Sequence, residues 1–168
     1  MNFFNKPLLF ISLTFFISSR VFGQTTNADS ILTVYKNIKS PEKKLEKTPK
    51  LVLYFASNNQ LKKAYEVIND ITVFKVESSN LAHKQGVIAL SNGLINNRES
   101  DFNSCLKNCK ESLSLLKNYK QELSESQSLI VTSLYSLGKF DSCISFGNKY
   151  LPEIRKSKNI TSETDVLL

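Results

Sequence analysis

Hydrophobic residues recur every three or four positions along most of the chain, which is the period of a helix with one buried side. Residues 72–76 alternate like a short strand, but no nearby segment offers a partner strand, so we expect a helix end there. The sequence therefore predicts an all-α protein. The predicted helices cover residues 29–38, 41–57, 60–73, 79–97, 102–116, 123–137 and 140–154.

Helix-start signals divide the chain further. Ser40-Pro41 matches an N-cap followed by proline at the first helical position, and Thr48-Pro49 repeats this signal. Either a helix restarts at Pro49 or one long helix kinks there. Residues 78–79 are expected to cap the next helix, whose apolar side includes Leu81.

The first 23 residues differ from the rest and have the layout of a secretory signal peptide. Lys6 precedes an apolar run over residues 8–17, and Val21-Phe22-Gly23 resembles a cleavage site. The alternative, a membrane anchor, needs about 20 apolar residues, and this run is too short. We therefore expect an exported protein, periplasmic or secreted, with no stable membrane insertion after cleavage.

An internal repeat sets the predicted architecture. The segment from Phe102 to Leu106 matches Phe140 to Ile144 nearly residue for residue, and Leu61 to Tyr65 fits more loosely. One turn later the same alignment pairs Ile68, Cys109 and Gly147. Each unit contains two helices that need a neighbour to bury their apolar sides. This predicts an α-solenoid of about three stacked antiparallel hairpins after a leading short helix.

Residues 134–144 resemble the tetratricopeptide repeat family. Gly138 is the turn glycine, an aromatic residue follows two positions later, and a small residue follows three further on. The unit spacing exceeds the family's period of about 34 residues. Gln127 also departs from the pattern, because a large aromatic residue is common there. The repeat-packing positions are Leu61, Phe102 and Phe140 for the large residue, and Ala64, Cys105 and Cys143 for the small residue.

The resemblance covers residues 41–158 and implies a superhelix whose first helices line a concave peptide-binding groove. Carried over to the last unit, it places Glu125, Ser128, Thr132 and Tyr135 on the concave side. The chain then divides into a signal peptide (1–23), an N-terminal segment with a short helix (24–40), tetratricopeptide-like repeats (41–158) and the start of a further helix or truncated repeat (159–168). The predicted function is an exported scaffold that binds a protein or peptide.

The three cysteines and the single histidine are the candidates for metal or catalytic chemistry. Cys105, Cys109, Cys143 and His83 have the composition of a zinc site. The repeat favours packing instead, because Cys105 and Cys143 align with Ala64, and a disulfide involving Cys109 stays open. No nucleophile elbow or phosphate loop is present. We therefore predict no catalysis, no metal and no cofactor.

The formal charge of +7 comes almost entirely from scattered lysines interleaved with acidic residues. Arginine, the usual residue for phosphate forks and base edges, is scarce, so we predict no nucleic-acid partner. Attraction to an anionic membrane or cell-wall surface remains an open alternative.

The chain ends on Val166-Leu167-Leu168, an apolar pattern typical of a helix that starts another unit. One explanation is that this end docks on the chain itself or on a partner, including self-association through the C-terminal helix. The other is that the chain is the extracytoplasmic sensor region of a longer membrane signalling protein, of the histidine-kinase or helix-turn-helix regulator type.

Overall fold

A computed structural model describes residues 27–157, together with residues 162 and 166. The predicted signal peptide and most of the 159–168 segment lie outside the described residues. The chain forms two compact units, residues 1–38 and 39–168. The described part of the first unit is a helix over residues 27–36, close to the predicted helix at 29–38.

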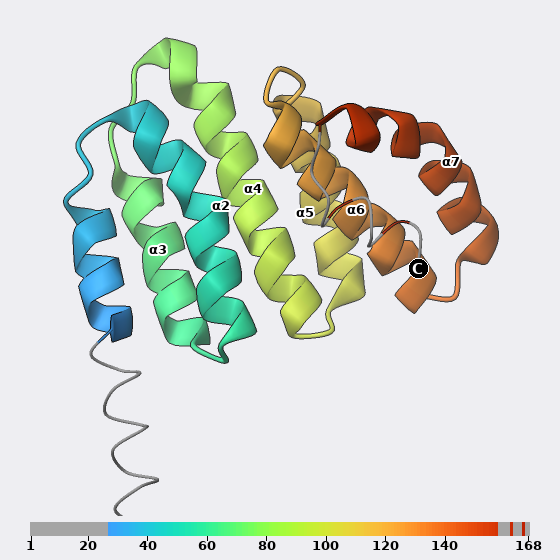
Figure 1. Cartoon of the computed structure of the whole chain (residues 1–168), viewed down its shortest axis with the longest axis horizontal. Coiled ribbons are helices and arrows are strands. Elements are labelled where there is room, and N and C mark those ends of the chain that lie inside the picture. The colour runs from blue at the N-terminus through green and yellow to red at the C-terminus, as the bar shows by residue number, and fades with distance from the viewer. Residues whose placement is uncertain (1–26, 158–161, 163–165, 167–168) are drawn as a thin grey trace, which may run out of the picture. The chain divides into compact units, whose positions relative to one another are not determined.

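The second unit is built from helices, and residues 27–157 contain no strand. This confirms the all-α prediction, and α3 ends at Val73 without the alternative strand at 72–76. The elements are α2 (Pro41–Ser57), α3 (Leu61–Val73), the short 3₁₀ helix η1 (Ser78–Asn80), α4 (Leu81–Arg98), α5 (Phe102–Leu115), α6 (Lys120–Ser136) and α7 (Phe140–Ser157) (Figure 1).

Local signals explain most helix starts. The Ser40 hydroxyl accepts a hydrogen bond from the Lys43 amide, and Pro41 occupies the first helical position of α2. Pro49 neither restarts nor ends this helix, because α2 runs through it as one element. Asp101 caps α5 by accepting a hydrogen bond from the Ser104 amide at 3.1 Å.

Two boundaries differ from the sequence prediction. Residues 78–79 do not cap α4: they belong to η1, and Asn80 precedes the first helical residue. Leu81 is 48% exposed, so its predicted place on the apolar side was wrong. It is the first residue of α4, where the helix has only begun to meet its neighbours. α6 begins at Lys120, three residues before the predicted start.

The three turns that join α2 to α3, α4 to α5 and α6 to α7 have the same backbone conformation. Asn59, Ser100 and Gly138 each adopt positive φ, at 58°, 62° and 69°. In each turn the next residue's amide bonds the carbonyl five residues back, at 2.8 or 2.9 Å, as in a Schellman motif. Each positive-φ residue lies two positions before the aligned residue Leu61, Phe102 or Phe140. The same turn thus recurs at the same offset from each of the three aligned residues.

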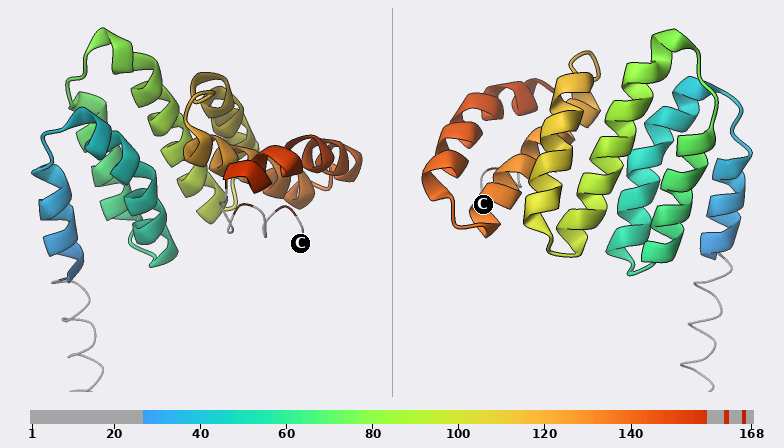
Figure 2. Two further views of the ribbon diagram at one scale, coloured as in Figure 1. Left: turned by 45° about the horizontal axis from the view of Figure 1, so that its top comes forward. Right: turned by 180° about the vertical axis from the view of Figure 1, so that it is seen from behind.

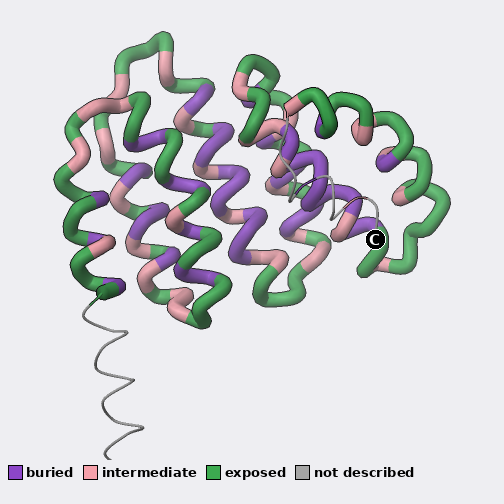
Figure 3. Tube along the Cα trace, viewed as in Figure 1, coloured by how far each residue is buried: buried purple, intermediate pink, exposed green. Residues whose placement is uncertain are grey.

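Successive helices of this unit lie side by side, and α2 and α6 also contact α4 (Figure 2). α4 and α6 carry buried residues along most of their length, whereas Gly147 and Ile154 are the buried residues of α7 (Figure 3). Among the aligned residues, Ala64 and Cys105 are fully buried, and Ile68, Cys109 and Gly147 are buried too.

The last pair departs from this packing. Cys143 is half-buried, as are Leu61 and Phe102, but Phe140 is 55% exposed. The Phe140 ring stands at the first residue of α7 and lies edge-to-face against Tyr135, with 5.7 Å between ring centroids. Phe140 therefore does not have the packing role expected from its position in the repeat.

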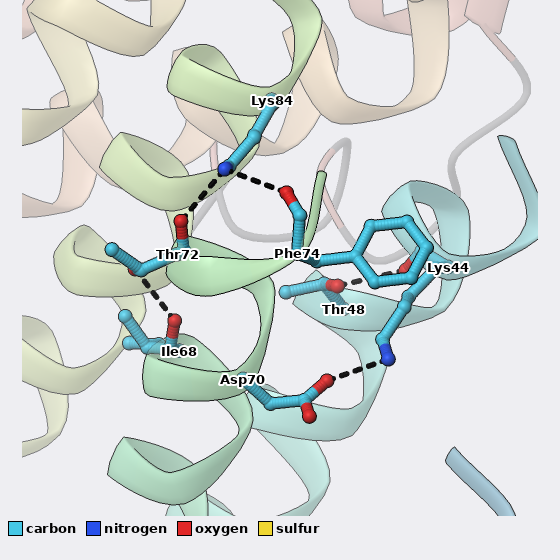
Figure 4. A network of polar contacts seen from close by, with 7 residues as sticks. All are labelled: Lys44, Thr48, Ile68, Asp70, Thr72, Phe74 and Lys84. Atoms are coloured by element: carbon cyan, nitrogen blue, oxygen red, sulfur yellow. Dashed lines mark hydrogen bonds and ion pairs between the residues drawn. The ribbon is translucent and has the colours of Figure 1, made fainter. Parts of the chain in front are cut away.

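A polar network links α2, α3 and α4 (Figure 4). Lys44 is buried and forms an ion pair with Asp70 at 2.7 Å, while its ammonium lies 4.4 Å from the centroid of the Phe74 ring. Lys84 of α4 donates to the carbonyls of Thr72 and Phe74, at 2.7 and 2.8 Å. These carbonyls belong to the C-terminal end of α3, where a cation also complements the helix dipole.

Candidate functional site

A pocket of about 470 Å³ lies between α2, α4 and α6, the first helix of each pair. Each helix contributes residues spaced three, four or seven apart, which is one helical face. Leu94 and Leu129 are buried and give the pocket an apolar floor. The lining consists of Lys50, Leu53, Ala56, Ser57, Leu94, Asn97, Arg98, Gln121, Glu125, Ser128, Leu129 and Ser162.

Charge is distributed unevenly over this pocket. The cations Lys50 and Arg98 come from α2 and α4, and the carboxylate of Glu125 comes from α6. Lys50 pairs with Glu46 at 2.9 Å, and Arg98 donates to the Asn59 side-chain oxygen at 2.7 Å. Both cations are exposed. The pocket therefore offers charges of both signs around an apolar floor.

Glu122 lies beside this pocket on α6. Burial raises the pKa of Glu122, and the charge of Glu46 adds to this effect, while the charge of Lys50 opposes it. Glu122 therefore senses charges on α2 from its position on α6.

The structure brings only part of the expected groove together. Glu125 and Ser128 line the pocket, but Thr132 and Tyr135 are not among its lining residues. The Thr132 hydroxyl donates to the Ser128 carbonyl of its own helix at 3.1 Å. Tyr135 is 62% exposed and contacts Phe140. Thr132 and Tyr135 lie further along α6 than the residues that line the pocket.

The residues of α2 and α4 were missed by sequence reasoning. Lys50, Leu53 and Arg98 look like ordinary surface positions, and the family resemblance could be carried over only for the last unit. The internal repeat could have identified these residues. The alignment of second helices at Leu61, Phe102 and Phe140 also aligns the helices that precede them.

The cysteines are free thiols in the structure. The sulfurs of Cys105 and Cys109 lie 3.9 Å apart in a buried position, and the Cys143 thiol donates to the Val131 carbonyl at 3.5 Å. Contact with Cys105 and burial raise the pKa of the Cys109 thiol. Within residues 27–157, 162 and 166, no group of three or more His, Cys, Asp or Glu side chains is placed to hold a metal ion.

His83 is buried and stacks on Tyr119, with 3.4 Å between ring centroids. Burial lowers the pKa of His83, which favours the neutral imidazole. Its Nε2 atom makes no hydrogen bond. His83 thus packs as a buried ring in the first turn of α4.

The described part of the chain contains no helix long and apolar enough to cross a membrane. Comparison with protein-family models finds no match, and comparisons with curated proteins and with solved structures find none either. The pocket between α2, α4 and α6 is thus the candidate site that the chain's own geometry supports.

Proposed function

We propose that this protein is an exported tetratricopeptide-like scaffold that binds a protein or peptide segment in the pocket between α2, α4 and α6, without catalysis. The observation that carries the proposal is the lining of that pocket. Apart from Ser162, it comes from the first helix of all three pairs, the helices to which the family resemblance assigns the groove.

The repeated turn supports the solenoid part of the proposal. Asn59, Ser100 and Gly138 share one backbone conformation at one offset from the aligned residues, as stacked copies of a single unit would. The signal-peptide pattern of residues 1–23 supports export.

The pocket's chemistry suits a short amphipathic segment. Leu53, Leu94 and Leu129 offer contact to an apolar side chain. Lys50 of α2, Arg98 of α4 and Glu125 of α6 favour a segment with charges of both signs around that side chain. Asn97 and Gln121 supply amides that can bond a peptide main chain.

The test uses a random peptide library selected against the full chain, because a library probe needs no prior ligand. Selected peptides are then measured against the double variant Leu53→Glu/Glu125→Lys, which changes the apolar and the charged part of the pocket. We expect the affinity to fall at least about tenfold, because central contacts dominate binding energy.

Leu81→Glu is the matched control, since Leu81 is exposed and is not a lining residue of the pocket. It should bind the selected peptides like the unmodified chain, and thermal unfolding should show that all variants are folded. Equal loss of binding in both variants, or no change in either, would place the peptide site elsewhere and contradict the proposal.

A further inference from the structure

A second recess lies between α5, α6 and α7. It consists of two adjoining clefts of about 280 and 320 Å³, which share Lys117, Leu123, Gln127 and Glu153. None of their residues lines the pocket between α2, α4 and α6. The two sites use different faces of α6, so a ligand in one does not require the other to be occupied.

Lysines dominate the rim of this recess. Lys110 and Lys117 line one cleft, while Lys117, Lys120 and Lys156 line the other. We call the recess lined by these four lysines the lysine cleft. None of the four side chains has an ion pair or hydrogen bond within the described residues. Elsewhere in the chain, Lys44, Lys50 and Lys84 have such partners.

Glu153 is the one acidic residue that lines the lysine cleft, and its carboxylate already accepts a hydrogen bond. The buried Gln127, 1% exposed, donates from its amide nitrogen to the Glu153 carboxylate at 2.8 Å. Gln127 occupies the position where the family pattern commonly has a large aromatic residue. Gln127 thus places a polar group in the core that holds Glu153, and the four lysines outnumber this one carboxylate.

We propose that the lysine cleft binds a ligand that carries several phosphate groups close together. A recess lined by one sign of charge concentrates counter-ions of the opposite sign. The lysine ammonium is a point charge without the planar fork of arginine. These side chains therefore select a ligand by the density of its negative charge and not by a bidentate hydrogen-bond geometry. A single exposed lysine–phosphate contact is weak, so four lysines, one each on α5, α6 and α7 and one in the α5–α6 connection, favour a compact multivalent anion.

The test is calorimetric titration of the full chain with inorganic tripolyphosphate at low and at moderate salt. We expect binding at low salt that weakens by roughly tenfold or more as salt rises, since exposed charges are screened. The double variant Lys117→Gln/Lys120→Gln should weaken binding by roughly tenfold.

Lys43→Gln/Lys62→Gln is the matched control, because it removes the same charge from exposed positions on α2 and α3. Its affinity for tripolyphosphate should change less than about twofold. Equal losses in the two double variants would reduce the effect to net charge and overturn the proposal. Absence of binding at low salt would overturn it as well.

Glu153 gives a second readout of opposite sign. Glu153→Gln keeps an acceptor for Gln127 but removes the one carboxylate of the cleft, so tripolyphosphate should bind more tightly. Glu77→Gln removes a carboxylate from the connector between α3 and α4 and should leave binding nearly unchanged. Equal tightening in both variants would contradict a local site.

A last arm distinguishes two sources of the phosphate groups. Vesicles of neutral phospholipid are compared with vesicles containing an anionic phospholipid. Co-sedimentation with the anionic vesicles that tripolyphosphate displaces would identify a lipid headgroup as the source. Binding of tripolyphosphate without co-sedimentation would identify a soluble ligand. The groove proposal is unaffected by either result, because its peptide assay uses other residues.

Discussion

Gly93 marks a close approach of α4 to α5. A Cβ atom at this position would lie 2.6 Å from the Cys109 sulfur, well inside van der Waals contact. Cys109 is fully buried, so its sulfur has little space into which to move. Glycine is therefore required at position 93 because it has no side chain, and not because its backbone is flexible.

Gly93→Ala should therefore destabilise the protein by about 1–3 kcal/mol, the range typical of overpacking. Thermal and denaturant unfolding measure this change. Cys109→Ala should restore part of the loss in the double variant, because it removes the atom that the new methyl group meets. Additive effects of the two substitutions would contradict the proposed clash.

Gly147→Ala is the control for this experiment. There the nearest atom to an added Cβ is Cγ1 of Val166 at 3.6 Å, an ordinary contact. Because alanine is the better helix former, this variant should be as stable as the unmodified chain or more stable. A loss as large as that of Gly93→Ala would contradict the packing described here.

Single positions also show what the sequence could not reveal. Asn59 and Ser100 adopt the same left-handed conformation as Gly138, which glycine and asparagine favour and serine does not. Serine carries no such preference, so the turn at Ser100 follows from the packing of α4 against α5. Gln127 is similar: its burial depends on Glu153, 26 residues away.

Among the elements, α2, α3 and α4 are joined by the Lys44 and Lys84 network. The side chain of Lys44 is 3% exposed and that of Asp70 is 23% exposed. Breaking a buried pair leaves the remaining charge poorly hydrated, which costs stability. When an exposed pair is broken, water hydrates the remaining charge.

Asp70→Asn should lower the free energy of unfolding by about 1–3 kcal/mol, less than a fully buried pair because Asp70 is partly hydrated. Glu46→Gln, which breaks the exposed Lys50 pair, should change it by at most about 0.5 kcal/mol. Chemical denaturation measures both variants. A Glu46→Gln effect as large as that of Asp70→Asn would refute the role given to burial.

Helix existence was predictable from the sequence, and helix boundaries were less so. The apolar period identified each helix of the second unit. Lys120 to Glu122 are polar and lie before the predicted start of α6, yet they form its first turn. Likewise, half of the expected groove lines the pocket. Lys50 and Arg98 join it through contacts between helices that are distant in sequence.

For the whole molecule, stability should depend on pH through His83. Burial lowers its pKa, so the unfolded chain takes up a proton more readily than the folded chain. The free energy of unfolding should therefore fall as pH drops below the ordinary value of 6.5. Above pH 6.5 His83 is neutral in both the folded and the unfolded chain, so its titration no longer lowers the free energy of unfolding.

His83→Phe preserves a ring against Tyr119 and should remove this pH dependence below pH 6.5. Glu122 acts with the opposite sign, because its raised pKa makes the folded chain less stable as pH rises above 4.5. Measurements in the Glu122→Gln background separate the two groups. An unchanged slope after His83→Phe would show that His83 is not the titrating residue.

The contacts between helices have a consequence for how quickly the chain acquires its structure. The helix pairs with extensive contact are neighbours in the chain or have one helix between them. Closing such short loops costs little chain entropy, and local contact patterns accompany folding in microseconds to milliseconds. Each pair, closed by its own turn, can form before the next pair has been synthesised. The order of assembly can then follow the order of translation, with α4 docking on α2 and α3 that are already in place.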